Sequence, residues 1–261
     1  MRGITITTTT AALVLILASS ASGQDTTITG GLTPNTPGDG SRVHVALGGG
    51  APEIAGALPE SIALGVQRGF VLDVRAVGAR CSGDAVTSGA CPAKSRIGSG
   101  QAVVHASGLV NQDIPATLDV FLADPVQAGD LASAVVVISG AGLKRAVRTR
   151  LLAPSGGPIG YELRLEGISG AVPAVPGVSL SLKSLSLDLG ARRKVTKTTT
   201  KRVRVTRNGK RVTVKRKVKR GVTYNLLRNP KTCNGAWAVR LTVRVGGADR
   251  VRDVGIACSP G

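Results

Sequence analysis

Hydrophobic and polar residues alternate with a period of two along most of the chain. The clearest case is 237–245, in which an aromatic or aliphatic residue fills every second position from Trp237 to Val245. The segments 117–122 and 161–166 alternate in the same way. This period is typical of a β-strand with one buried and one solvated face, as in antiparallel sheets covered on one side. No stretch of a dozen residues shows the 3.6-residue period of a helix.

Further apolar runs predict the other strands of an all-β protein. We expect these strands at 42–47, 61–75, 101–107, 133–139, 146–152 and 250–257. Turns rich in Gly, Pro and Ser separate about ten short strands, which favours an antiparallel β-sandwich with Greek-key-like connections and one protruding basic β-hairpin. Between two cysteines, the segment 82–90 is expected to hold a single helical turn, with Ser82 or Asp84 as its cap.

The leucines of 179–189 change parity in the middle of the segment. They occupy every second position up to Leu182 and again from Leu185 onward. Two residues there must share one pairing position for both sets to belong to one strand. We therefore predict a β-bulge, or a bend that carries the strand between sheets.

The segment 192–222 is predicted to form the basic hairpin. Its Asn208-Gly209 dipeptide favours a two-residue turn, because both turn positions need positive φ. The register fixed by this turn places four pairs on one face: Val205 with Val212, Val203 with Val214, Thr199 with Val218 and Val195 with Val222. The other face pairs Thr206 with Arg211, Arg204 with Thr213, Arg202 with Lys215 and Thr200 with Lys217.

The hairpin carries most of the excess charge of the chain. The whole sequence has 34 Lys or Arg and 15 Asp or Glu, a net charge of +19, and fifteen of the cations lie between Arg192 and Arg220 with no acid among them. With Arg2 also set aside, eighteen basic residues remain against fifteen acidic ones. Like charges oppose each other in the ladder at two pairs, Arg202 with Lys215 and Lys201 with Arg216, at a cost of about 0.2–1 kcal/mol each.

Two hypotheses explain a cationic hairpin of this kind. Its charges either neutralise an anionic partner or keep sheet edges from pairing with other chains. The partners expected under the first hypothesis are an anionic wall polymer, an acidic polysaccharide or an anionic lipid surface, and no specific nucleic acid. The candidate anion-binding residues are Lys201, Arg202, Arg204, Arg211, Lys215, Arg216, Lys217 and Lys219.

The first residues have the order of a cleavable secretory signal. Arg2 precedes an apolar run, 11–18, that is too short to span a bilayer, and small residues follow it up to Gly23. The alternatives are an uncleaved anchor and a buried strand. We expect a signal peptide at 1–23, a flexible linker at 24–41 and a single β-sandwich domain at 42–261. The mature protein is then expected in the envelope or outside the cell, with no transmembrane segment after cleavage.

The four cysteines agree with an exported protein stabilised by disulfides. Four cysteines allow three connectivities, and we expect the local pairs Cys81–Cys91 and Cys233–Cys258 because each lies within one apparent structural unit. No Cys-x-x-Cys motif is present, so neither a redox motif nor a zinc knuckle is expected. With only two His and one Met, no metal centre and no cofactor is expected. The five aromatic residues also argue against an aromatic sugar cleft or a base-stacking platform.

A catalytic triad is the main alternative function. Ser95 or Ser99, His105, and Asp113 or Asp119 supply the residue types of a hydrolase. Chains rich in Ser and Asp contain such combinations by composition alone, and no Gly-x-Ser-x-Gly motif is present. No catalytic residue is therefore predicted.

Two parts of the sequence resemble a set of exported actinobacterial proteins. In that set an LP…GF strand leads to a Cys and then to a CPAxSxIGxG segment, as here from Leu58-Pro59 through Gly69-Phe70 and Cys81 to 90–102. Those proteins often continue with a basic hairpin and a terminal C…W…C unit, matched here by Cys233, Trp237 and Cys258. The likeness covers most of 58–105 and 192–258. It implies export, disulfides and a β-rich body, and it transfers no catalytic residue.

Taken together, the sequence predicts a non-enzymatic exported β-sandwich protein whose basic hairpin is a candidate for binding anionic polymers or surfaces. One alternative is a secreted hydrolase with a site built from distant Ser, His and Asp residues. The other is a passive structural surface protein.

Overall fold

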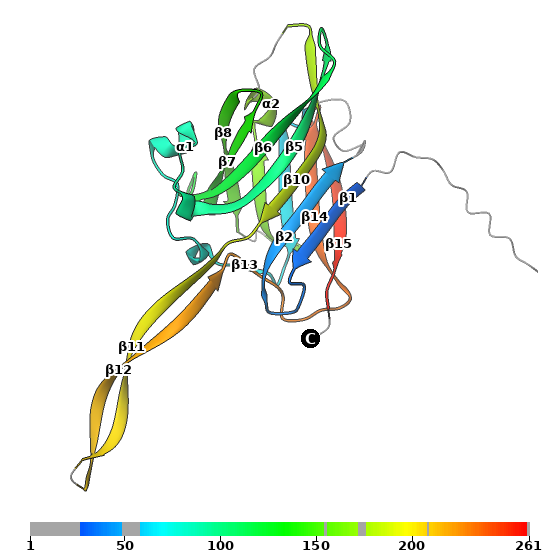
Figure 1. Cartoon of the computed structure of the whole chain (residues 1–261). Coiled ribbons are helices and arrows are strands. Elements are labelled where there is room, and N and C mark those ends of the chain that lie inside the picture. The colour runs from blue at the N-terminus through cyan, green and yellow to red at the C-terminus, as the bar shows by residue number, and fades with distance from the viewer. Residues whose placement is uncertain (1–26, 49–57, 154–155, 172–175, 208, 260–261) are drawn as a thin grey trace, which may run out of the picture.

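The fold is all-β and antiparallel, as predicted. The computed structural model describes residues 27–48, 58–153, 156–171, 176–207 and 209–259 (Figure 1). The predicted signal peptide, 1–23, lies outside the described residues. We call the two-stranded sheet at 192–225 the ribbon and the other described residues the body.

The body contains one large antiparallel sheet and four short helical segments. Its strands are β1 (Thr27–Thr33), β2 (Gly40–Gly48), β3 (Ser61–Gln67), β4 (Val71–Leu72), β5 (Arg96–Gly108), β6 (Gln112–Ala123), β7 (Asp130–Gly140), β8 (Leu143–Leu152), β9 (Ile159–Glu166), β10 (Val178–Leu189), β13 (Leu227–Arg228), β14 (Ala236–Val245) and β15 (Ala248–Ala257). The helical segments are η1 (Val74–Ala76), α1 (Asp84–Ser88), η2 (Ala93–Ser95) and α2 (Ile168–Ala171). No helix in the described part of the chain is long and apolar enough to cross a membrane.

The strand order contains a Greek-key-like connection. The sheet runs β15-β14-β3-β9-β8-β7-β6-β5-β10-β2-β13-β4, and β1 pairs with β2 outside this path. The strands from β5 to β9 follow one another as antiparallel neighbours. The chain then returns through α2, and β10 pairs with β5 instead of β9. A return to the first strand of a consecutive series is the defining step of the Greek key.

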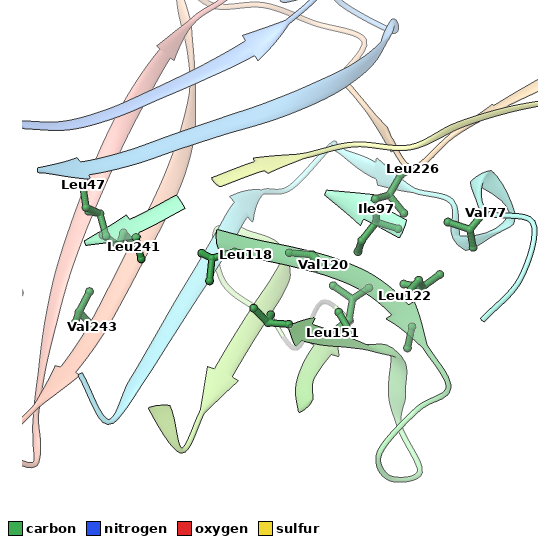
Figure 2. Packing of buried hydrophobic residues seen from close by; sticks show 14 of the residues in the cluster. Leu47, Val77, Ile97, Leu118, Val120, Leu122, Leu151, Leu226, Leu241 and Val243 are labelled. Atoms are coloured by element: carbon green, nitrogen blue, oxygen red, sulfur yellow. The ribbon is translucent and has the colours of Figure 1, made fainter. Parts of the chain in front are cut away.

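The apolar faces of the two halves of this sheet pack against each other. Leu47 on β2 belongs to the same buried cluster as Leu241 and Val243 on β14, although the two strands are far apart in the sheet order (Figure 2). Val120 and Leu122 on β6 are fully buried in this cluster. The alternating residues of the sequence therefore supply the facing layers of a sandwich.

The leucine row of β10 contains the predicted bulge. The pairing of β10 with β5 shifts register between Leu182 and Ser184. Because of this shift Leu182 lies opposite Val104 and Leu185 lies opposite Ala102, two residues further along β5. Alternate residues of a strand share a face, so both leucines pack toward the core.

The predicted flexible linker at 24–41 is wrong for residues 27–33 and for residues 40–41, which already belong to β2, so the sandwich begins before the predicted residue 42. Residues 27–33 form β1, which pairs over its whole length with β2, and Leu32 is buried. The segment is rich in Thr, which favours strands when a partner offers a free edge. Residues 34–39 connect β1 to β2.

Two local predictions also need correction. The single strand expected at 61–75 ends at Gln67, where Gly69 adopts a φ of 103°, and the chain continues as β4 and η1. The helical turn expected at 82–90 exists as α1. Its N-cap is Gly83, which has no capping side chain, and Asp84 is the first helical residue.

Candidate anion-binding site

The ribbon consists of β11 (Arg192–Arg207) and β12 (Lys210–Asn225), which pair with each other in a sheet of their own. It extends away from the body and meets it only at the root (Figure 1). Each strand has sixteen residues, which corresponds to about 50 Å at 3.3 Å per residue.

The predicted register of the ribbon is confirmed at every pair. Val203 lies opposite Val214, Thr199 opposite Val218 and Arg202 opposite Lys215, and the ladder continues to Asn225, three residues beyond the predicted end. Gly209 has the positive φ, 73°, that the turn requires. The other turn residue, Asn208, lies outside the described residues.

The eight candidate residues are exposed, but they divide between the two faces of the ribbon. Residues opposite each other share a face, and successive pairs alternate between faces. Lys201 and Arg216 are opposite each other and therefore lie on the face that carries Val203 and Val214. The other face carries the remaining six: Arg202, Arg204, Arg211, Lys215, Lys217 and Lys219.

This second face is a row of cations and threonines. Lys215, Lys217 and Lys219 follow each other at every second position of β12, so their Cα atoms are spaced by about 7 Å along the strand. Thr200 and Thr198 lie opposite the last two of these lysines. Lysine and threonine side chains both donate hydrogen bonds to phosphate oxygens, so the face suits a ligand with regularly repeated anionic groups.

The cations of the ribbon have no carboxylate partners in the described structure. Every ion pair between described residues joins two residues of the body. Two ribbon cations near the root have other contacts: the Arg193 guanidinium donates to the Val77 carbonyl oxygen at 3.1 Å, and Lys197 lies 5.4 Å from the Tyr224 ring centroid. The positive charge along the ribbon therefore remains uncompensated.

The root of the ribbon is tied to η1. Arg75 stacks over Tyr224 with its guanidinium carbon 4.7 Å from the ring centroid. Asp73 holds this arginine with an ion pair of 2.8 Å, and the hydrogen bond from Arg75 lowers the pKa of the Asp73 carboxyl below its usual value. The backbone contributes a further contact, because Leu226 N donates to Ala191 O at 2.8 Å across the base. The ribbon thus starts from a fixed position, which reduces the entropy lost when it binds a ligand.

Leucines beside the root line a small apolar cavity between the layers of the sandwich. Leu189 and Leu226, which flank the ribbon in sequence, line an apolar cavity of about 70 Å³ together with residues of β2, β3, β8 and β9. Ligand sites usually have volumes of about 300–1,000 Å³. The cavity is therefore a packing space between the layers.

A polar groove lies on the outer face of the body next to the root. One part, of about 220 Å³, is lined by Arg42, Arg96 and Asp188 among others, and it continues into a part of about 550 Å³ along β5, β6 and β10. Its carboxylates are paired: Asp119 with Arg96 at 2.5 Å, and Asp188 with His44 at 2.9 Å. The groove is thus close to electrically balanced. Its residues come from strands far apart in sequence, so no local pattern of residues predicts it.

The structure does not bring the predicted hydrolase residues together. Ser95 is fully buried and donates to the carbonyl of its own loop. Ser99 lies on β5 six residues before His105, a separation of about 20 Å along the strand. His105 Nδ1 does approach Asp113, at 2.8 Å, and the pKa of this carboxyl is lowered by hydrogen bonds from Lys183 and then from His105. This cluster is exposed on an open sheet face.

One neighbour of this cluster was missed from the sequence. The register of β10 and β5 places Ser181 opposite His105, and only the pairing of these two strands brings the residues together. The described structure shows no hydrogen bond between the Ser181 and His105 side chains. Asp119, the other predicted acid, is held by Arg96 in the groove.

Both predicted disulfides are confirmed. Cys81 bonds Cys91 around α1, and Cys233 bonds Cys258 beside β14. Two disulfides are compatible with an oxidising location. Among the described residues no cysteine is free, and no three His, Cys, Asp or Glu side chains are grouped to hold a metal ion.

Comparisons of the chain with models of protein families, with curated proteins and with solved structures find no match.

Proposed function

We propose that the chain is a non-enzymatic exported protein of the cell envelope or the extracellular space, whose ribbon binds anionic polymers or surfaces. One observation carries the proposal: fifteen cations without an acid among them lie on a ribbon that extends from a body of nearly balanced charge. The signal-like sequence of 1–23 and the two disulfides support the exported location.

The energetics favour an anionic partner of many repeated charges. A Lys or Arg near an anionic surface contributes about 1 kcal/mol, so several ribbon cations acting together are enough for firm attachment. A charge of this kind acts over about 8 Å at physiological salt, because the salt screens it beyond that distance. The ribbon extends well beyond this distance from the root, so it reaches a partner before the body does.

The alternative role, protection of sheet edges, fits the strand order less well. The edge strands of the main sheet are β15, β4 and β1, and neither ribbon strand pairs with any of them. The cations therefore cannot shield the edges of the main sheet. The ribbon cations can protect only the edges of the ribbon from pairing with other chains. Edge protection therefore does not explain why the protein has a long charged ribbon.

A shortened ribbon tests the proposal. Replacing 197–220 with Asn-Gly keeps a two-residue turn between Thr196 and Gly221, which are opposite each other in the intact ladder. We expect the shortened protein to pass through a phosphate-bearing matrix at low salt while the intact protein is retained.

A matched control removes charge from the body instead. Five exposed body cations that form no ion pair in the described structure are replaced by glutamine: Lys94, Lys144, Arg145, Lys231 and Arg252. This variant is expected to be retained like the intact protein. Retention of the shortened protein at the intact level overturns the proposal and favours a passive structural role.

A further inference from the structure

Near its tip the ribbon exposes valines as well as cations. Val203 lies opposite Val214, and the next pair on the same face is Val205 with Val212. Val205 and Val214 are 37% and 38% exposed, which places them among the few large hydrophobic side chains that the described structure leaves open to solvent. Aliphatic side chains at successive positions of one face form a small apolar band.

The body does not cover this band. The ribbon contacts the body at its root, through η1. Val203 lies ten residues along β11 from Arg193, which is about 33 Å from the root contact. The valines are therefore available to whatever the ribbon binds.

Cations lie on both sides of the apolar band. Lys201 with Arg216 precedes it on the same face, and Lys210 follows it at the turn. Lys210 and Arg216 are six residues apart on β12, or about 20 Å. The valines are thus enclosed between positive charges along the ribbon.

This arrangement selects among the anionic partners of the proposed function. A soluble polyanion satisfies the cations and leaves the valines in water. A second copy of the chain would bring two strongly cationic ribbons together, which electrostatic repulsion opposes. An anionic bilayer can bind both the cations and the valines. Its headgroups bear the negative charges, and its interface accepts short apolar side chains.

We propose that the part of the ribbon near its tip, residues 201–206 and 213–216, docks on an anionic lipid surface with the side chains of Val203, Val205 and Val214 in the interface. This inference rests on the proposed function and narrows its partner to a lipid surface. The cations of the valine face engage headgroup phosphates beside the apolar band. The cations of the other face, which include six of the eight candidate residues, do not contact the headgroups in this orientation and act on the surface through long-range attraction.

The first test distinguishes the contribution of the valines to vesicle binding from that of the cations. The variant Val203→Thr with Val214→Thr keeps two β-branched residues of similar size and leaves every cation in place. On vesicles of equal parts phosphatidylglycerol and phosphatidylcholine, we expect its binding to weaken about tenfold, while its binding to inorganic polyphosphate is unchanged. Val251→Thr, at a valine of the body that is 57% exposed, is the matched control and should bind both like the intact protein.

The second test uses the alternation of the strand. A polarity-sensitive dye is attached to Val205→Cys on the valine face or to Thr206→Cys on the opposite face. The native cysteines are all in disulfides, so the new thiol is the site of labelling. On the anionic vesicles we expect a blue shift of the dye at 205 and little shift at 206.

The outcomes distinguish the inference from the function on which it rests. Equal vesicle binding by the intact and double-threonine proteins, with equal dye shifts at 205 and 206, overturns the lipid inference and leaves a soluble polyanion as the partner. Absence of binding to both vesicles and polyphosphate by the intact protein overturns the proposed function itself.

Discussion

The body and the ribbon differ in how their charges are paired and in whether their apolar side chains are buried. In the body, carboxylates and cations form ion pairs on the outer faces, and the apolar residues meet in the core. In the ribbon, fifteen cations have no acid among them, and valines near the tip are exposed. The difference indicates that the stability of the molecule resides in the body, and it supports the proposal that the ribbon contacts an anionic partner.

The ribbon has few sources of stability of its own. A two-stranded hairpin is marginally stable in water, and its like-charged pairs lower its stability further. Its turn, its ladder and its root at η1 hold it in place, and no core supports the tip. An anionic partner removes the repulsion between cations, so binding and ordering of the ribbon are thermodynamically linked.

The largest expected effect on the body comes from Trp237. This side chain is 1% exposed, packs edge-on against Phe70 with ring centroids 5.8 Å apart, and donates from Nε1 to the Thr232 carbonyl oxygen at 2.9 Å. Trp237→Ala should lower the free energy of unfolding by about 3–5 kcal/mol in a denaturant titration. Retention on the phosphate matrix should persist under conditions where the variant is folded. If the folded variant is no longer retained on the matrix, anion binding depends on the body as well as on the ribbon.

The next effect comes from the disulfide around α1. Replacing Cys81 and Cys91 together by alanine should cost about 2–4 kcal/mol, because the ten-residue separation is no longer closed in the unfolded chain. Thermal unfolding measures the change. The root contacts through Arg75 and Val77 involve neither cysteine, so matrix binding at 25 °C should stay the same. A loss of binding equal to that of the shortened ribbon contradicts the separation.

Body and ribbon should also differ in their response to acid. The side chain of Asp130 is 1% exposed and accepts hydrogen bonds from Arg150, which lower the pKa of this carboxyl below the usual 3.8. A carboxyl with a lowered pKa stabilises the fold above its unfolded pKa, and this contribution disappears as pH falls through the lower folded value. Asp130→Asn should therefore be less stable than the intact protein near pH 7, and the difference should shrink below about pH 4. A gap in the unfolding temperature that stays constant with pH rules out this account of the ion pair.

The sequence predicted the ribbon better than the body because the relevant signals are local. Asn208-Gly209 sets the register, and the leucine parity requires the bulge near Leu182. The strand β1 was missed because its segment contains paired glycines and no clear alternation, and its partner β2 supplies the missing information. The outer groove was missed for the same reason, since only the strand order brings Arg42 and Arg96 together.

The smallest expected effect lies within the ribbon. Lys201→Thr with Arg216→Thr removes a like-charged pair, so the ribbon should gain about 0.2–1 kcal/mol of local stability. Hydrogen exchange of the ribbon amides reports this gain, and amides of the body core serve as the internal reference. The same variant should bind the phosphate matrix more weakly. Slower exchange without weaker binding indicates that this pair does not contact the anion.

The salt dependence of retention tests the central claim most directly. For the intact protein, the logarithm of the retention constant should fall linearly with the logarithm of salt concentration, with a slope of about −4 to −5 if about five cations contact phosphates. A variant with threonine at Lys201, Arg202, Arg204, Arg211, Lys215, Arg216, Lys217 and Lys219 should show a clearly shallower slope, because it keeps only seven of the fifteen ribbon cations. The control with five neutralised body cations should keep the slope of the intact protein. Equal slopes for the intact protein and the eight-residue variant would contradict the assignment of anion binding to the ribbon.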